Sequence, residues 1–186
     1  MLQKDNRSKV LRMFFEDPLP KGIGFQLREI SKKVGVAPPS VKKYLQELEQ
    51  ESLITIKKHR IYNYPIYYAN LDHEKFIFLK RLDTILRSKE SGLLDYLWEK
   101  CQPGCIILFG SAARGEDLKE SDLDLFIESE SIPLHLEKYE KALQRRISIF
   151  FGAHFNTLSK ELKNNIINGI ILKGYLKVFY HGRNPY

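Results

Sequence analysis

The residues best suited to chemistry lie within residues 108–127, in the stretch LFGSAARGEDLKESDLDLFI. Gly110 and Ser111 follow an apolar run, and Asp122 and Asp124 come after ten intervening residues. Glycine lets the backbone approach a phosphate closely, and serine adds a hydroxyl donor beside main-chain N–H groups. Aspartates at i and i+2 of a strand share a face and suit a Mg²⁺ ion that also binds phosphates. The stretch therefore predicts a site for a nucleoside triphosphate and a divalent cation; the alternative is an acidic surface turn between two strands.

The same pattern resembles a known superfamily. A Gly-Ser pair, ten intervening residues and Asp-x-Asp occur in the nucleotidyltransferases that include DNA polymerase β, and the likeness is closest to the minimal nucleotidyltransferases. Arg114-Gly115 and Ser121 also match. The ending NGIILKGYLKVF, residues 168–179, is similar to the tail of archaeal members. The likeness covers most of residues 90–180, and its specific part is the central motif.

The resemblance implies a role for each motif residue. Gly110, Ser111 and Arg114 would bind the nucleotide, and Asp122 and Asp124 would be catalytic and hold Mg²⁺ or Mn²⁺. The implied reaction is attack of an acceptor hydroxyl on the α-phosphate of a nucleoside triphosphate (NTP), with release of pyrophosphate. In the minimal family the acceptor is often a protein. From the residues alone, Arg114 could instead form an ion pair with an acid in the loop that follows.

A third carboxylate, which enzymes of this superfamily normally carry on the next strand, has no counterpart here. The chain has no Asp or Glu between Glu140 and Glu161. Aligning RISIFF with that strand puts Ser148 at the position, and aligning GAHF puts Gly152 there with His154 nearby. A lost general base typically costs 10²- to 10⁴-fold in rate, and a two-metal site would lose a ligand. Two hypotheses stay open: nucleotide transfer, or a transcriptional regulator that binds a nucleotide without catalysis.

The first third of the chain predicts three short helices followed by a hairpin. Apolar residues at helical spacing stop at Asp17-Pro18, and Gly35 ends a second amphipathic pattern. Pro38-Pro39 can open a third helix, because the N–H groups of a first turn have no helical partner. Two strands should follow, with Lys57-Lys58-His59-Arg60 forming the tip between them.

This order is that of a winged helix, and residues 25–56 resemble the winged helix-turn-helix of prokaryotic transcription regulators. The recognition helix would start near Pro39 and enter the major groove, while the wing contacts backbone phosphates. Lysines favour phosphates over base edges. The predicted contacts to double-stranded DNA are Ser40, Lys42, Lys43, Lys57, Lys58 and Arg60. The alternative is a winged helix that makes protein contacts only, with these lysines as a solvated face.

Charge is distributed unevenly along the chain. Residues 1–70 hold 13 Lys or Arg against 7 Asp or Glu, a net charge of +6. Residues 71–186 hold 17 against 16, a net charge of +1. The surplus of positive charge therefore lies in the segment that resembles the winged helix, where it favours a polyanionic partner.

The predicted fold class is α+β, with a winged helix over residues 1–70, a connecting helix over 71–89 and a nucleotidyltransferase-like domain with a mixed sheet over 90–186. The connecting helix could mediate a homodimer or pack between the two domains. The third segment predicts the element order α-β-β-α-β-α-β, which the resemblance also implies. Strands are expected at Cys105–Phe109, Asp122–Ile127, Ile147–Phe151 with Ala153–Phe155 as further strand, and near Ile170–Tyr180.

The sequence predicts a soluble globular protein, and we expect it in the cytoplasm. It is 43% hydrophobic and 28% charged, and it has no apolar run approaching the roughly 18 residues of a membrane span. The polar start MLQKDNRSKV does not resemble a secretory signal. Cys101 and Cys105 are too few for a structural zinc site, so they are expected to be buried free thiols.

Overall fold

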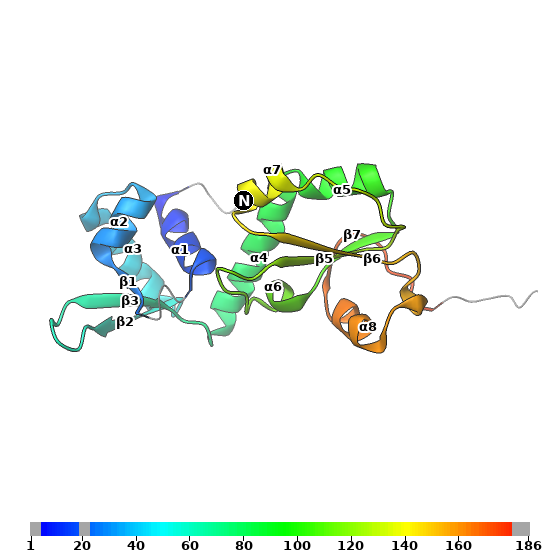
Figure 1. Ribbon diagram of the computed structural model, residues 1–186. Helices are drawn as coiled ribbons and strands as arrows, with labels where there is room; N and C mark the ends of the chain where they lie inside the picture. Colours follow the sequence, from blue (N-terminus) through cyan, green and yellow to red (C-terminus); the bar gives the residue numbers. More distant parts are fainter. Residues whose placement is uncertain (1–4, 19–22, 180–186) are drawn as a thin grey trace, which may run out of the picture. The chain divides into compact units, whose positions relative to one another are not determined.

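The computed structural model describes residues 5–18 and 23–179, and the chain divides into two compact units (Figure 1). The first unit comprises Met1–Asp83 with Gly115–Glu120, and the second comprises Thr84–Arg114 with Ser121–Tyr186. Helix α4 (Glu74–Glu90) continues from one unit into the other. Each unit combines helices with one β-sheet, which confirms the predicted α+β class.

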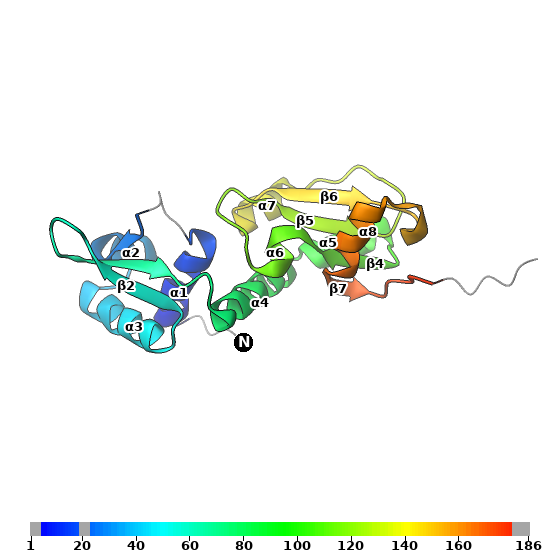
Figure 2. The same ribbon diagram turned by 90° about the horizontal axis from the view of Figure 1, so that it is seen from below.

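The first unit is a winged helix. Its sheet has the strand order β1-β3-β2, in which both neighbouring pairs are antiparallel. Its elements are α1 (Asn6–Glu16), β1 (Phe25–Gln26), α2 (Leu27–Val34), α3 (Pro38–Gln50), β2 (Ile54–Lys58) and β3 (Pro65–Ala69). The predicted helices and hairpin are confirmed; the two-residue strand β1 was not expected. Figures 1 and 2 both show the β2–β3 turn extending beyond α2 and α3.

Local sequence explains where the helices of this unit begin and end. The Asp5 side chain caps α1 by accepting a bond from the Ser8 N–H at 2.6 Å. Gly35, with φ of +68°, ends α2 in the left-handed region that favours glycine. Pro38 occupies the first position of α3. One apolar stripe from each helix is fully buried in a shared core, which contains Val10, Phe14, Ile30, Val41, Leu45 and Leu48.

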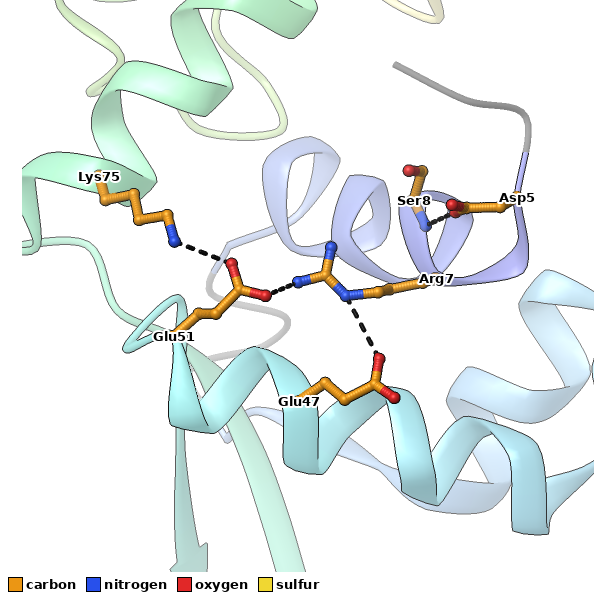
Figure 3. A network of polar contacts seen from close by, with 6 residues as sticks. All are labelled: Asp5, Arg7, Ser8, Glu47, Glu51 and Lys75. Atoms are coloured by element: carbon orange, nitrogen blue, oxygen red, sulfur yellow. Dashed lines mark hydrogen bonds and ion pairs between the residues drawn. The ribbon is translucent and has the colours of Figure 1, made fainter.

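Glu51, at the C-terminal end of α3, lies at the centre of a polar network that joins α3 to α1 and α4 (Figure 3). It forms ion pairs with Arg7 and with Lys75, the latter at 2.8 Å, and Arg7 also lies 3.4 Å from Glu47. The hydrogen bond from Lys75, with the Arg7 charge, lowers the pKa of Glu51 below its ordinary value. The network fixes the end of α3 while the rest of its outer face stays exposed.

The second unit is built on a four-stranded mixed sheet with the order β6-β5-β4-β7. Strand β4 is antiparallel to both β5 and β7, whereas β5 and β6 are parallel. Its elements after α4 are α5 (Leu93–Cys101), β4 (Cys105–Leu108), α6 (Gly110–Arg114), β5 (Leu123–Ile127), α7 (Glu137–Leu143), β6 (Ile147–Phe151), a 3-10 turn at Phe155–Thr157, α8 (Lys160–Ile167) and β7 (Ile170–Gly174).

Helices cover both faces of this sheet, with α5 and α7 on one face and α8 on the other (Figures 1 and 2). Side chains alternate between the faces along each strand, so two separate cores form. Leu97, Leu108 and Leu125 belong to the core under α5 and α7, and Phe126 and Ile166 belong to the core under α8. The inner strands β4 and β5, which position the candidate site residues, are therefore supported by packed side chains on both faces.

One predicted strand segment of this unit is wrong, and the predicted closing strand is present but shorter than expected. Ala153–Phe155 is not a strand; Phe155 begins the 3-10 turn and buries its ring. The last strand ends at Gly174, whose φ is +84°, so it is shorter than the predicted Ile170–Tyr180. Residue 180 lies outside the described part of the chain.

Both cysteines are free, as predicted, and Cys105 is fully buried while Cys101 is partly buried. Burial, together with the nearby Glu128 carboxylate, raises the pKa of the Cys105 thiol to about 12. Burial also raises the pKa of Cys101. Neither thiol is therefore activated as a nucleophile, which agrees with a packing role.

Candidate functional site

Asp124 and Gly110 lie against each other where β4 gives way to α6. The backbone N–H of Phe109 donates to the Asp124 carbonyl at 3.0 Å, which fixes the two segments side by side. Gly110 has φ of +71°, and a Cβ placed on it would overlap the Asp124 Oδ2 and lie 3.4 Å from Cγ. The Asp124 carboxylate thus occupies the space that any other residue at position 110 would fill. The glycine is needed for both its backbone conformation and this close approach.

Asp122 adds a second carboxylate close enough to affect the first. Asp124 is partly buried, and burial followed by the negative charge of Asp122 raises its pKa above the ordinary aspartate value. Asp122 itself is exposed and directly precedes β5. A buried carboxylate repelled by a neighbouring one is stabilised in its charged form by a cation. The pair therefore fits a divalent metal that a bound polyphosphate also contacts.

Ser111 and Arg114, the other predicted nucleotide-binding residues, both belong to α6 (Gly110–Arg114), a short helix that the predicted element order did not include. Ser111 is partly exposed, one residue after the glycine that contacts Asp124. Arg114 is exposed at the last position of the helix. All of the predicted nucleotide-site residues are thus carried by α6 and by the chain entering β5.

The pairing of β5 with β6 decides between the two registers considered for a third carboxylate. Asp124 lies directly beside Ser148 in the parallel pair, so RISIFF is the strand that follows Asp-x-Asp. Ser148 is partly exposed and shares the face of Asp124, whereas Gly152 lies beyond the end of β6 and His154 is exposed past it. Within residues 5–18 and 23–179, no three His, Cys, Asp or Glu side chains gather as a metal site. Two carboxylates and a hydroxyl are what these strands provide.

Glu128, the other acid on the Asp122–Asp124 strand face, lies at the opposite end of the β4–β5 pair. Its side chain packs against Gly104, and its backbone N–H donates to the Cys105 carbonyl at 3.1 Å. Asp124 is bonded to Phe109, which is four residues after Cys105 and directly follows the end of β4. Glu128 is therefore separated from the candidate site by the length of the strand.

A buried ion pair, which the sequence did not predict, joins the loop between Gly-Ser and Asp-x-Asp to α4. Lys80 of α4 and Asp117 are 1% and 0% exposed, and Lys80 Nζ lies 3.2 Å from Asp117 Oδ1. The same ammonium donates to the Asp117 carbonyl. Lys119, exposed in this loop, lies 3.7 Å from Asp17. Because breaking a buried pair leaves an unpaired charge, this contact holds the loop firmly in the first unit.

All six predicted DNA-binding residues are exposed. Ser40 lies in the first turn of α3, and Lys42 and Lys43 follow it on the helix, both outside the buried stripe of Val41, Leu45 and Leu48. Lys57 and Lys58 were predicted at the tip of the hairpin, but they belong to strand β2, because the strand continues two residues further than its apolar run. Arg60 is in the turn itself.

The hairpin turn also holds an aromatic cluster that the sequence analysis did not single out. The His59 ring stacks on Tyr64 with centroids 4.6 Å apart and on Tyr62 at 5.3 Å. The alternating His-x-x-Tyr-x-Tyr order at the turn was the signal that could have shown it. This cluster sits among the exposed cations of the same hairpin.

Comparison with protein families shows that residues 91–168 match the model of the nucleotidyltransferase domain. No curated protein matches the chain. Among solved structures, the chain is similar to a point mutant of ZitR from Lactococcus lactis, with 18% identity and a TM-score of 0.37 over 50% of this chain. The match spans 60% of that protein's length. In the described part of the chain, every helix is too short or too polar to span a bilayer. The family match supports assigning residues 91–168 to the nucleotidyltransferase superfamily.

Proposed function

We propose that this protein binds double-stranded DNA through its winged helix, binds an NTP with Mg²⁺ or Mn²⁺ through its second unit, and transfers a nucleotide to an acceptor hydroxyl. The observation that carries the proposal is the Asp124 carboxylate lying against Gly110 with Asp122 beside it. The family match over residues 91–168 supports the same chemistry. The proposed domains are residues 1–70, the connecting helix 71–89, and residues 90–186.

In this proposal each site residue has a defined task. Asp122 and Asp124 hold the metal, and Gly110, Ser111 and Arg114 receive the triphosphate. The metal, when bound, neutralises phosphate charge and orients the α-phosphate. The acceptor oxygen forms a bond to the α-phosphorus while the bond from that phosphorus to the bridging oxygen breaks. Pyrophosphate leaves, and the hydroxyl proton passes to a base on the acceptor or in solvent.

A second candidate function is favoured by the position of Ser148. Because Ser148 lies beside Asp124, the site has only the carboxylates of Asp122 and Asp124. Two carboxylates are enough for one Mg²⁺ shared with a triphosphate. It provides no carboxylate to activate the acceptor, and the absence of such a base typically slows a reaction 10²- to 10⁴-fold. In this alternative the protein is a transcriptional regulator that binds a nucleotide as a signal and does not turn it over.

The DNA-binding part of the proposal is supported by charge and exposure. The cations of α3 and of the β2–β3 hairpin are exposed, and the winged helix carries most of the net positive charge of the chain. Such a surface fits the phosphates of a duplex. A homodimer through α4 belongs to the same proposal, since many winged-helix regulators are twofold dimers. Light scattering with and without duplex DNA measures that assembly.

Label transfer separates the two functions. The protein is incubated with each of the four NTPs labelled at the α-phosphate, with Mg²⁺ or Mn²⁺, with duplex DNA and with candidate acceptor proteins. We expect label on an acceptor, and its loss in the Asp122→Ala, Asp124→Ala double variant. Nucleotide binding without transfer under every condition would support the regulator, and the absence of any nucleotide binding would contradict both functions.

The Ser148→Asp variant sharpens this test, because it introduces a carboxylate beside Asp124 on the same sheet face. If the chain transfers nucleotides slowly because it lacks a base, the rate should rise by about 100-fold, the lower end of what a general base contributes. The matched control is Ser129→Asp, which adds the same charge after the end of β5. No change in rate on Ser148→Asp would contradict the idea that the missing acid limits transfer.

A further inference from the structure

We propose that Ile61, at the tip of the β2–β3 hairpin, inserts into the minor groove of duplex DNA, partly unstacks a base step and bends the bound DNA. The inference rests on the proposed DNA-binding function and adds a mode of contact to it. The cations of the hairpin account for contacts to phosphates alone.

The first observation is the exposure of apolar side chains on the turn. Ile61 is 73% exposed and Tyr62 is 72% exposed, although the core of this unit buries large apolar side chains from each of its helices. Both residues lie in the turn between β2 and β3. This turn extends past α2 and α3 (Figures 1 and 2). Neither side chain belongs to the buried core of the unit, so Ile61 is available for contact with a partner.

The second observation is that hydrogen bonds and ring stacking within the turn support its conformation. The His59 Nδ1 accepts bonds from the N–H groups of Ile61 and Tyr62 at 3.2 and 3.3 Å. The His59 N–H donates to the Tyr64 carbonyl at 2.8 Å, and the Asn63 N–H donates to the His59 carbonyl at 3.0 Å. The rings of Tyr62 and Tyr64 both stack on His59. A tip fixed in this way loses little conformational freedom on insertion between bases.

The third observation is the charge that surrounds the tip. Lys57, Lys58 and Arg60 are exposed on the same hairpin. The sequence contains no Asp or Glu between Glu51 and Asp72, so the hairpin itself carries no acidic side chain. Cations flanking an exposed apolar side chain match a groove lined by phosphates, in which apolar wedges unstack base steps and bend the duplex. This combination favours DNA over a protein partner.

Energy transfer between dyes at the two ends of a short duplex measures the bend directly. The duplex carries a central TA step, which kinks easily, and 2-aminopurine at that step reports unstacking. With the full chain at about 50 mM salt, we expect a bend in the range of about 20–90° and brighter 2-aminopurine. Ile61→Ser should lose most of the bend and bind about tenfold more weakly, whereas Ile61→Leu should keep both. Ile167→Ser, at an exposed position of α8, is the matched control and should behave as the wild type.

The outcomes separate the wedge from DNA binding in general. A wild-type protein that binds the duplex without bending it overturns the wedge alone, as does an Ile61→Ser variant that bends DNA like the wild type. Failure of the wild type to bind any duplex overturns both the wedge and the DNA-binding function. In that case, capture of Ile61 by a protein surface becomes the explanation for its exposure. An unchanged thermal melt of Ile61→Ser shows that its fold is intact.

Discussion

The winged helix and the second unit present charge in opposite ways. In the winged helix, exposed cations are spread along α3 and the β2–β3 hairpin. In the second unit, two carboxylates meet at one point, where β4, α6 and β5 are joined by the Phe109–Asp124 backbone bond and by Gly110. The affinity of the distributed surface, the cations of α3 and the hairpin, should fall gradually when these residues are replaced one by one. The affinity of the point site, Asp122 and Asp124, should be lost after a single substitution.

The largest effect should follow from changing one carboxylate of the point site. Asp124→Asn removes a charge from a site where Asp122 supplies the other, and we expect NTP affinity in the presence of Mg²⁺ to fall about 100-fold, or about 2.7 kcal/mol. Isothermal titration calorimetry measures it. Glu130→Gln, at an exposed acid of the same unit, is the control and should bind normally. Equal affinities for wild type and Asp124→Asn would show that the carboxylates do not hold the metal.

Two glycines, Gly110 and Gly92, test whether NTP binding depends on the close approach of the backbone to Asp124, apart from the charge of the site. Gly110 and Gly92 have similar positive φ values, +71° and +79°, but a Cβ at Gly92 would meet nothing within 4 Å. Substitution by alanine should destabilise both proteins by about 1–2 kcal/mol through backbone strain. Gly110→Ala should also displace the Asp124 carboxylate and weaken NTP binding about tenfold. Denaturant unfolding and calorimetry measure the two effects, and equal nucleotide affinities in the two variants would refute the proposed close approach.

The distributed surface of the winged helix should respond in smaller steps. Lys42→Ala and Lys43→Ala should each weaken duplex binding a few-fold at low salt, since each variant leaves one phosphate without its cation. The slope of log affinity against log salt should become less negative by about 0.9 for each such phosphate. Fluorescence anisotropy between about 50 and 200 mM salt measures this slope. Lys141→Ala, at an exposed lysine of α7, should leave it unchanged; a similar change in this control would mean that binding is not localised on α3.

The smallest effect is expected in the network that holds the end of α3. Because the pKa of Glu51 is lowered in the folded protein, its contribution to stability is present above the unfolded pKa of about 4.3 and is lost as the pH falls through the folded pKa. The Glu51 side chain is 39% exposed, so screening limits this contribution to less than about 1 kcal/mol. Urea unfolding at pH 7 should therefore show a slightly less stable Glu51→Gln variant. At about pH 3 the difference from wild type should shrink; a difference that grows at pH 3 would refute the assignment.

Local patterns predicted much of the fold because they are fixed by neighbours in the sequence. The buried stripe of α3, the glycine that ends α2 and the spacing of Gly110 from Asp124 all depend on short-range geometry. The sequence left two alternatives for the residue beside Asp124, Ser148 or Gly152. The pairing of β5 with β6 places Ser148 there.

Features that depend on tertiary contacts could not be predicted in the same way. Lys80 and Asp117 are of residue types that are normally exposed, and only the folded chain pairs them out of water. Strand β1 has two residues and forms because β3 offers backbone partners to it. Ala153–Phe155 has an apolar character that suits a strand, but Phe155 is buried under α8 in a 3-10 turn.

The most direct test of the central claim is a crystal structure of the protein with Mg²⁺ and an NTP analogue whose α–β bridging oxygen is replaced by carbon. We expect a metal ion at about 2.0–2.1 Å from carboxylate oxygens of Asp122 and Asp124, with triphosphate oxygens beside Gly110 and Ser111 completing its coordination. A nucleotide bound elsewhere, or a metal that contacts neither aspartate at millimolar ligand, would contradict it.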